Sequence, residues 1–179
     1  MFYVLFSLAL AAETCGEPFA SSVTVELDQS WLVLDRGVLT IDSRVIGVEV
    51  VQMSEVAANR VAFVQRRPDS MLLDLLVWDA EQGVRVLVDG SRPSQPVLSP
   101  DGAYVGFVDA RTSIASVYTV PFEGGEPAQR TNVGLVRTPG RAPEGFVSPP
   151  RSGFEVDGRG LTWTEDGVTH VVSWNGGDL

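Results

Sequence analysis

Apolar and polar side chains alternate along most of the chain with a period of two residues. Val23, Val25 and Leu27 alternate with Thr24 and Glu26 in the first such segment, and this alternation predicts half-buried β-strands rather than helices. Further short apolar segments follow at regular spacing, and we predict strands over Trp31–Leu34, Val38–Ile41, Val45–Val51, Arg60–Val64, Leu72–Trp78, Val84–Val88, Ala103–Val108, Val117–Phe122, Leu161–Trp163 and His170–Trp174.

Residues that favour turns separate these segments. Gly, Pro, Asp and Asn stand between successive strands, and the chain holds 18 Gly and 11 Pro among its 179 residues. Only Ser54–Arg60 and Ser70–Leu76 offer short helical alternatives. Many short strands at regular spacing are typical of an all-β sandwich, barrel or propeller.

An internal repeat favours the propeller among these architectures. The segment Pro96–Gly102 (PVLSPDG) leads into one predicted strand, and a later strand ends in Glu123-Gly124-Gly125. A repeat of ~40–50 residues that holds four strands indicates a propeller blade. Two shifts of the sequence against itself align the repeats. The first pairs Phe63 with Phe107, Val77 with Val120 and Gly83 with Gly125, and the second pairs Ser148-Pro149-Pro150 with Ser99-Pro100-Asp101 and Trp174–Gly177 with Phe122–Gly125.

The segment Pro96–Thr131 (PVLSPDGAYVGFVDARTSIASVYTVPFEGGEPAQRT) resembles the WD40-like Pro-Asp β-propeller repeat of TolB-like exported bacterial propeller proteins. The similarity is looser over 45–90, where Ala58-Asn59 replaces the Pro-Asp-Gly turn, and over 143–179, where Pro150-Arg151 replaces Asp-Gly. The resemblance implies an all-β fold, a small or incomplete propeller of about four blades built from four-stranded antiparallel repeats. The repeat's motif positions in this chain are Ser99, Pro100, Asp101, Gly102, Gly124 and Gly125.

The Ser-Pro-Asp-Gly motif is expected to be structural rather than catalytic. In Pro100-Asp101-Gly102 the proline presets φ, the aspartate can bond the backbone two residues on, and the glycine accepts positive φ. Because strand side chains alternate, Tyr104 and Phe107 should lie on opposite faces of the next strand, and Tyr118 and Val120 on one face of the third. Aromatic side chains would then pack between neighbouring blades.

The first residues are expected to form an export signal. The apolar run Phe2–Ala12 is too short for a bilayer span, which needs ~20 residues, but matches a signal-peptide core of ~7–15. Small residues at Ala9 and Ala11 provide a cleavage site, although a buried first strand or helix is the alternative. Cys15 is the only cysteine and polar residues precede it, so we expect neither a disulfide nor lipid anchoring.

The expected organisation is therefore a signal peptide with a flexible mature N-terminus over residues 1–20 and a propeller domain over 21–179, with its clearest repeat at 96–131. The protein is expected to be exported, periplasmic or extracellular. Two arrangements remain open for the blades: the N-terminal segment supplies a missing final strand and closes the ring, or open blade edges lead to self-association or await a partner.

The composition argues against several classes of function. A net charge of −10 disfavours nucleic-acid binding, which needs clustered positive charge. With one histidine, His170, and one cysteine there is no zinc motif, and we find no nucleophile elbow, phosphate-binding loop or calcium loop. No catalytic residues, metal or cofactor are expected. Spacing alone does not test for the paired carboxylates of glycoside chemistry, because β folds bring distant loops together.

One long Pro/Gly/Arg-rich segment, 131–153, is the candidate binding element. It exceeds the ~4–6 residues usual between elements, and long loops are often functional. Its candidate binding residues are Arg137, Arg141, Phe146 and Arg151, with Leu135 and Phe146 as apolar anchors. The alternative is an insertion between blades that only covers an edge.

These observations favour a non-enzymatic module that binds a protein or peptide in the bacterial cell envelope or outside the cell. The alternative is the accessory propeller domain of, or a fragment from, a multi-domain exported hydrolase or peptidase. Neither hypothesis involves nucleic acid or a membrane span.

Replacing Arg137 and Arg141 together with Ala tests the candidate segment. We expect weaker capture of a partner because arginine is enriched at binding hot spots. Thermal stability should stay near the wild-type value, since the segment lies outside the predicted strands. Affinity capture and a melting curve measure the two quantities, and unchanged capture would contradict the assignment.

Overall fold

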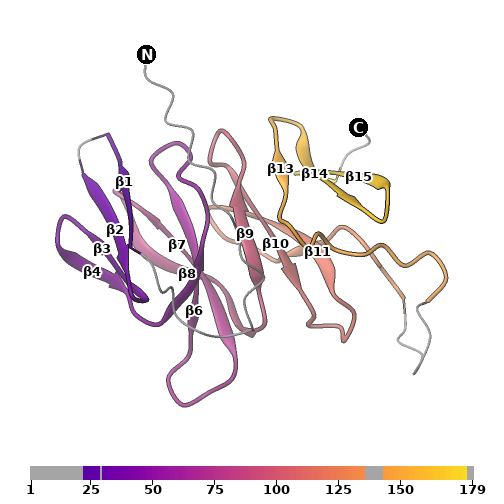
Figure 1. Ribbon diagram of the computed structural model, residues 1–179, viewed down its shortest axis with the longest axis horizontal. Coiled ribbons are helices and arrows are strands. Elements are labelled where there is room, and N and C mark those ends of the chain that lie inside the picture. Colours follow the sequence, from indigo (N-terminus) through magenta and orange to yellow (C-terminus); the bar gives the residue numbers. More distant parts are fainter. Residues whose placement is uncertain (1–21, 29, 136–142, 177–179) are drawn as a thin grey trace.

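The computed structural model describes residues 22–28, 30–135 and 143–176, and in this part the chain consists of β-strands, turns and loops without a helix. The strands form four antiparallel sheets that follow one another along the molecule (Figure 1). Sheet 1 contains β1 (Val23–Glu26), β2 (Trp31–Asp35), β3 (Val38–Ile41) and β4 (Arg44–Gly47); sheet 2 contains β5 (Val50–Met53), β6 (Val61–Arg66), β7 (Leu73–Asp79) and β8 (Gly83–Ser91); sheet 3 contains β9 (Ser94–Leu98), β10 (Tyr104–Asp109), β11 (Ser116–Pro121) and β12 (Ala128–Gln129); sheet 4 contains β13 (Glu155–Val156), β14 (Gly160–Glu165) and β15 (Val168–Ser173).

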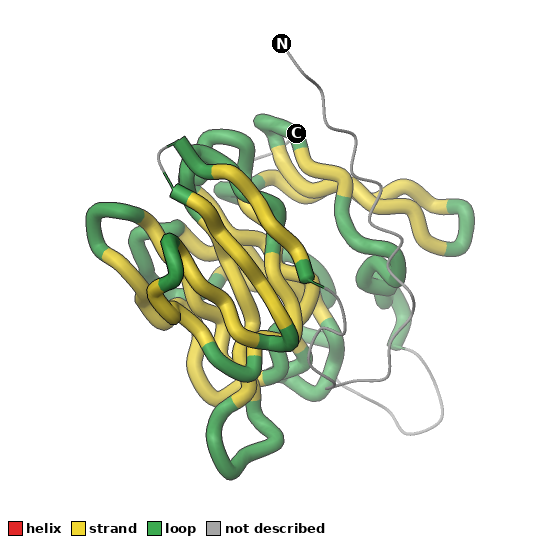
Figure 2. The backbone as a smooth tube through the Cα atoms, turned by 60° about the vertical axis from the view of Figure 1, so that its left-hand side comes forward, coloured by secondary structure: helices red, strands yellow, loops and turns green. Residues whose placement is uncertain are grey.

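Each sheet is a meander in which every strand pairs with the next strand along the chain. The turns between second and third strands therefore lie at the same end of the molecule as the links from one sheet to the next. Hydrogen bonds join these connections: the Val50 amide donates to Gly37 O (2.9 Å) and the Arg66 amide to Glu49 O (3.0 Å). We call this end the loop face. Figure 2 shows the loops gathered at the ends of the strands.

Apolar side chains fill three seams between successive sheets. Leu32 and Leu34 of sheet 1 cluster with Val61 and Phe63 of sheet 2, and all four are fully buried. A second cluster joins sheets 2 and 3, and a third joins sheets 3 and 4 through Trp163 and its neighbours. This arrangement confirms the prediction of an all-β, propeller-like fold of about four repeats.

The aromatic positions confirm most of the predicted repeat. Phe63 and Phe107 both lie on the second strand of their sheet and face the preceding sheet. Tyr118 and Val120 share one face, as predicted, and the Tyr118 ring stacks on Phe107 with 5.6 Å between centroids. The alignment of Val77 with Val120 is wrong, because Val77 faces the following sheet and Val120 faces the preceding one.

Several predicted segments need correction. The single strand predicted over Val45–Val51 is two strands, β4 and β5, because the chain turns at Glu49 (φ 52°) and passes into the next sheet. Neither helical alternative forms: Ser54–Arg60 is a loop with an isolated bridge, and Ser70–Leu76 runs into β7. Strands β9, β12 and β13 are not among the predicted strands.

The turn of the last repeat also differs from the predicted alignment. Pro150-Arg151 lies in the link before β13 and not in a turn between strands. The position equivalent to Asp101 is taken by Asp157, whose Oδ1 accepts the amides of Arg159 (2.7 Å) and Gly160 (2.9 Å) before β14. The long insertion between sheets 3 and 4 shifts the spacing, and this shift caused the misalignment.

Sheets 3 and 4 are in close contact at Gly106. A Cβ added at Gly106 would lie 2.6 Å from Leu161 Cδ1 and 3.2 Å from Trp174 Cζ3. Trp174 cannot easily retreat, because its indole donates to Asp157 O (2.9 Å) and its carbonyl accepts the Thr119 hydroxyl (3.0 Å). This contact therefore requires a residue without a side chain.

We predict that Gly106→Val lowers the free energy of unfolding by about 1–3 kcal/mol, because it overpacks this seam. Gly158→Ala is the matched control, since nothing lies within 4 Å of a Cβ at Gly158 and its φ is not positive. Urea denaturation measures both values. Equal stability of the two variants would contradict the close packing of sheets 3 and 4.

Candidate functional site

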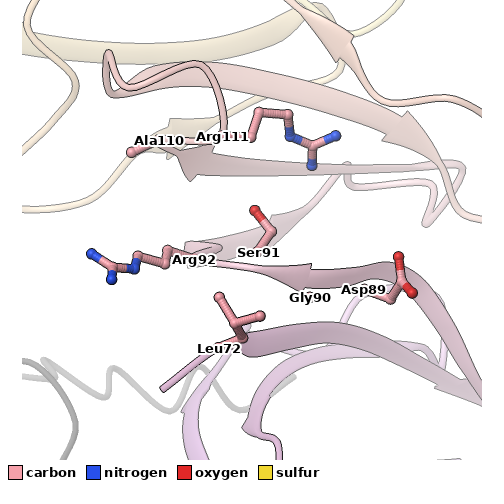
Figure 3. Close-up of a pocket in the computed structure, with 7 residues that line it drawn as sticks. All are labelled: Leu72, Asp89, Gly90, Ser91, Arg92, Ala110 and Arg111. Atoms are coloured by element: carbon pink, nitrogen blue, oxygen red, sulfur yellow. The ribbon is translucent and has the colours of Figure 1, made fainter. Parts of the chain in front are cut away.

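A hollow of about 340 Å³ opens on the loop face above the seam between sheets 2 and 3 (Figure 3). Three connections border it: the β6–β7 turn, the β8–β9 link and the β10–β11 turn. Its lining residues are Leu72, Asp89, Gly90, Ser91, Arg92, Ala110 and Arg111. Segments far apart in the sequence thus meet at one place, and the packing of sheets 2 and 3 brings them there.

A buried carboxylate at the end of β10 organises this hollow. Asp109 accepts hydrogen bonds from the Ser91 hydroxyl, the Arg92 amide (3.3 Å) and the Ala110 amide (2.7 Å). It also forms an ion pair with Arg111 (2.9 Å). A buried charge needs several donors, and these donors come from both sheets. Asp109 therefore ties the β8–β9 link to the β10–β11 turn.

The guanidinium groups of the two arginines in the hollow differ in their contacts with other residues. The Arg111 guanidinium is held by Asp109 and lies over the Tyr118 ring, 4.8 Å from its centroid. The Arg92 guanidinium is exposed and has no hydrogen bond or ion pair with any described residue. Its charge is therefore available to a ligand.

The other end of the hollow carries negative charge. Asp89 lies at the opposite end from Arg92 in Figure 3 and forms a 3.3 Å ion pair with Arg67. Arg67 also binds Asp74 at 2.8 Å, and this hydrogen bond raises the pKa of the guanidinium. Leu72, between the two ends, is partly exposed. The hollow thus offers a free cation beside an apolar side chain.

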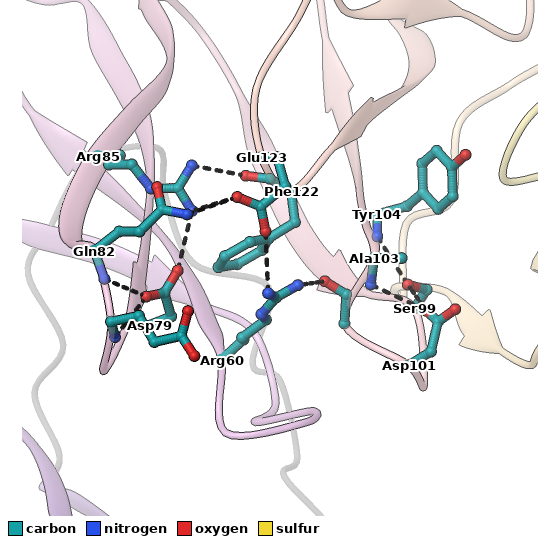
Figure 4. A network of polar contacts seen from close by, with 12 residues as sticks. Arg60, Asp79, Gln82, Arg85, Ser99, Asp101, Ala103, Tyr104, Phe122 and Glu123 are labelled. Atoms are coloured by element: carbon teal, nitrogen blue, oxygen red, sulfur yellow. Dashed lines mark hydrogen bonds and ion pairs between the residues drawn. The ribbon is translucent and has the colours of Figure 1, made fainter.

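A second polar network lies at the other end of the same seam (Figure 4). The guanidinium groups of Arg60 and Arg85 approach the Phe122 ring, at 4.3 and 5.1 Å from its centroid. Glu123 forms ion pairs with both arginines, at 3.0 and 3.8 Å. The Gln82 amide donates to the same carboxylate at 2.8 Å. These contacts link the two sheets, and among the described residues only the buried Nε of Arg85 in this network lacks a hydrogen-bond partner.

The motif Ser99-Pro100-Asp101-Gly102 forms the turn beside this network. The Ser99 hydroxyl donates to Asp101 (2.6 Å) and accepts the Tyr104 amide (2.9 Å), while Asp101 accepts the Ala103 amide (3.0 Å). The Ser99 hydroxyl, followed by the Ala103 amide, lowers the pKa of Asp101.

The backbone conformation explains why glycine occupies three positions of the motif. Gly102 has φ 69°, and a Cβ there would lie 2.9 Å from Arg60 Cδ. Its carbonyl accepts the Arg60 guanidinium (2.9 Å). Gly124 and Gly125 also have positive φ, 106° and 130°. These conformations fit the structural role expected for the motif.

Of the four binding residues expected in segment 131–153, Phe146 and Arg151 lie within the described residues. Arg137 and Arg141 lie outside the described residues. Phe146 is half-buried, and Arg151 forms a 2.9 Å ion pair with Glu165. A binding role for these four residues stays a prediction.

The ends of this segment are fixed on the loop face. Asn132 exchanges two hydrogen bonds with the backbone of Val147 (2.7 and 2.8 Å), and the Trp163 indole donates to Ser148 O (2.9 Å). Val147 and Phe154 pack against the third apolar cluster, whereas Leu135 and Phe146 are not part of it. The role of Leu135 and Phe146 as apolar anchors stays a prediction.

Other chemistry is sparse in the part of the chain that the structure describes. His170 packs against the Trp163 ring at 5.1 Å. Among the described residues, no group of three or more His, Cys, Asp or Glu side chains could hold a metal ion. No helix within the described ranges is long and apolar enough to cross a membrane. The expected export signal at 1–20 and Cys15 lie outside these ranges.

Comparison with known proteins finds similar folds among the solved structures, and two of these are given below. No protein-family model and no curated protein matches the sequence. The fold is similar to a putative TolB from Agrobacterium tumefaciens (TM-score 0.45, 16% identity, 62% of this chain and 42% of that one) and to TolB from Acinetobacter baumannii (TM-score 0.40, 14% identity, 83% and 47%). The chain spans less than half the length of either structure.

Sequence reasoning missed Arg92, Arg111 and Asp109. The signal that could have identified them is their place in the repeat, since Arg92 lies in a link between sheets and Arg111 in a turn between second and third strands. Once the strand order is known, both positions fall on one face.

The acid sensitivity of the network in Figure 4 is testable at Asp79. Burial raises the pKa of this carboxyl, but hydrogen bonds from the Gln82 amide (2.6 Å) and Arg85 (3.1 Å) outweigh burial and bring the pKa below its usual value. A lowered pKa means that the ionised carboxylate adds stability above about pH 4, the unfolded value, and that this contribution is lost as the pH falls further.

We predict that Asp79→Asn lowers the free energy of unfolding by about 1–3 kcal/mol at pH 7, because it removes charge-assisted hydrogen bonds. The difference from wild type should shrink on acidification, since wild-type Asp79 then becomes protonated. Urea denaturation at neutral and acidic pH measures it, with Asp69→Asn in an exposed turn as the control. A pH-independent difference would contradict the assignment.

Proposed function

We propose that this protein is a non-catalytic module that binds a protein or peptide partner at the hollow above the seam between sheets 2 and 3. The free Arg92 guanidinium carries the proposal, because it stands beside the partly exposed Leu72 in a concave site. Arginine next to apolar surface is the composition that interfaces favour. The proposal includes export, which rests on the apolar run Phe2–Ala12.

The chemistry of the hollow indicates which segment of a partner would bind. A carboxylate would pair with Arg92, and a neighbouring apolar side chain would cover Leu72 and reach towards the exposed Met71. The net charge of −10 repels strongly acidic partners at a distance. We therefore expect a segment with one carboxylate beside an apolar residue rather than an acidic run.

The Arg-rich segment 131–153 is a second reason to place the binding site on the loop face. Its described ends are fixed at Asn132 and Val147, so the segment arises from the end of the molecule where the hollow lies. Arg137 and Arg141 would extend the contact of a partner that is already held at Arg92. The double substitution described above tests this extension separately.

Selection of displayed random peptides on the wild-type protein tests the proposal. We predict that the enriched peptides carry a carboxylate next to an apolar residue and that Arg92→Gln weakens their binding by about tenfold, the effect of losing one charge-assisted contact. Fluorescence polarisation with the labelled peptide measures the dissociation constant.

Arg44→Gln is the matched control, since Arg44 is exposed and begins β4 at the end of the molecule away from the loop face. It should bind the selected peptide as the wild type does. Equal binding by the Arg92 and Arg44 variants, or a failure to enrich any peptide, would overturn the proposed site.

A further inference from the structure

Two sheet faces have no neighbouring sheet in the part of the chain that the structure describes. We call the face of a sheet towards the preceding sheet its leading face and the opposite face its trailing face. Each of the three apolar clusters joins the trailing face of one sheet to the leading face of the next. The leading face of sheet 1 and the trailing face of sheet 4 belong to none of them, and Figure 1 shows these two sheets at opposite ends of the row.

The leading face of sheet 1 is hollowed and carries exposed apolar side chains beside Glu26 and Asp35. Trp31 is 53% exposed, although tryptophan is normally well buried. The cross-strand pairs place Val33 opposite Thr40, and Thr40 opposite Val45, on this same face. A hollow of about 560 Å³ lies here, lined by Val33, Asp35, Arg36, Val38, Thr40 and Ser43. This surface has room for side chains of a neighbouring sheet.

The trailing face of sheet 4 lies at the other end of the row of sheets and also has an exposed apolar side chain. Leu161 and Trp163 point towards sheet 3, so Thr162 and its cross-strand partner Val171 point away from it. Val171 is 53% exposed. The hydroxyl groups of Thr164 and Thr169, also on this face, bond to each other at 3.1 Å. Glu155, opposite Thr162, also lies on this face, whose other strand residues are uncharged and suit packing against another sheet.

We propose that two copies of this chain associate head to tail, with the trailing face of sheet 4 of each copy on the leading face of sheet 1 of the other. The proposal does not depend on the peptide site. Such a contact repeats the geometry of the three internal seams. Since one face of each kind is open among the described residues, a pair that closes on itself would complete both junctions at once and leave no such face for growth. The eight sheets of the pair lie within the range of ~4–8 blades that propellers hold.

Charges at the loop face fit this junction. Turns between second and third strands of adjacent sheets are neighbours, since Leu72 and Ala110 border one hollow. At the new junction the β14–β15 turn would meet the β2–β3 turn of the other copy. Asp166 in the first turn is exposed, and Arg36 in the second has 84% of its side chain exposed and only a 3.5 Å ion pair with Asp35. Opposite charges would therefore face each other.

Sedimentation velocity of the full chain, and of three variants, tests the proposal. We expect wild type to have twice the mass of one chain and both Trp31→Arg and Val171→Arg to raise the dissociation constant by about tenfold or more. Val86→Arg is the control, because Val86 is 54% exposed but lies on β8 of sheet 2, away from both faces. Its dimer should be unchanged.

Mixing the two damaged variants tests the head-to-tail arrangement. In a pair of one Trp31→Arg and one Val171→Arg chain, one junction holds both substitutions and the other holds neither. The mixture should therefore dimerise better than either variant alone. In parallel, Arg36→Asp should weaken the dimer and the added Asp166→Arg should restore it, with circular dichroism showing that each variant is folded.

Four results would overturn the proposal: a wild-type monomer at all concentrations, a dimer that neither substitution weakens, a dimer that responds to Trp31→Arg but not to Val171→Arg, or no gain on mixing. The third result would indicate a symmetric contact between two copies of sheet 1. A series of ever larger species would also overturn it, because the closed pair ends growth.

Discussion

Burial of apolar side chains between successive sheets is the interaction on which the rest of the structure depends. A single sheet of short strands is marginal in water, and stability needs a covered hydrophobic face. Here Leu34, Phe63 and Phe107 are fully buried in seams that join different sheets. The candidate site follows from the same packing, because Arg92 and Arg111 meet only where sheets 2 and 3 pack together.

Many carboxylates of this acidic chain stabilise the ends of strands. Asp101 and Asp157 each accept backbone amides in the turn before the second strand of a sheet, and Asp79 does so after a third strand. Asp109 uses the same chemistry across a seam. Hydrogen bonds to the ionised form lower the pKa of Asp101 and Asp157. Part of the negative net charge therefore comes from carboxylates that build turns.

The sequence predicts the strands and their faces well, since an alternating pattern directly determines which side chains point to one side, as with Tyr104 and Phe107. It does not show where one sheet ends and the next begins, because a period of two continues through Val45–Val51 although the chain changes sheets. The role of Arg92 depends on what surrounds it in space. Neither the hollow nor the absence of a partner for its guanidinium among the described residues can be inferred from local pattern.

The fold and the candidate site both depend on the packing of sheet 2 against sheet 3, and proton NMR tests this packing most directly. Arg60 and Phe122 are far apart in sequence, yet the guanidinium carbon lies 4.3 Å from the ring centroid. The account predicts nuclear Overhauser contacts between the Arg60 side chain and the Phe122 ring, with upfield-shifted Arg60 methylene protons that return to ordinary values in Phe122→Leu. Arg60 protons at ordinary positions with no contact to the ring would contradict it.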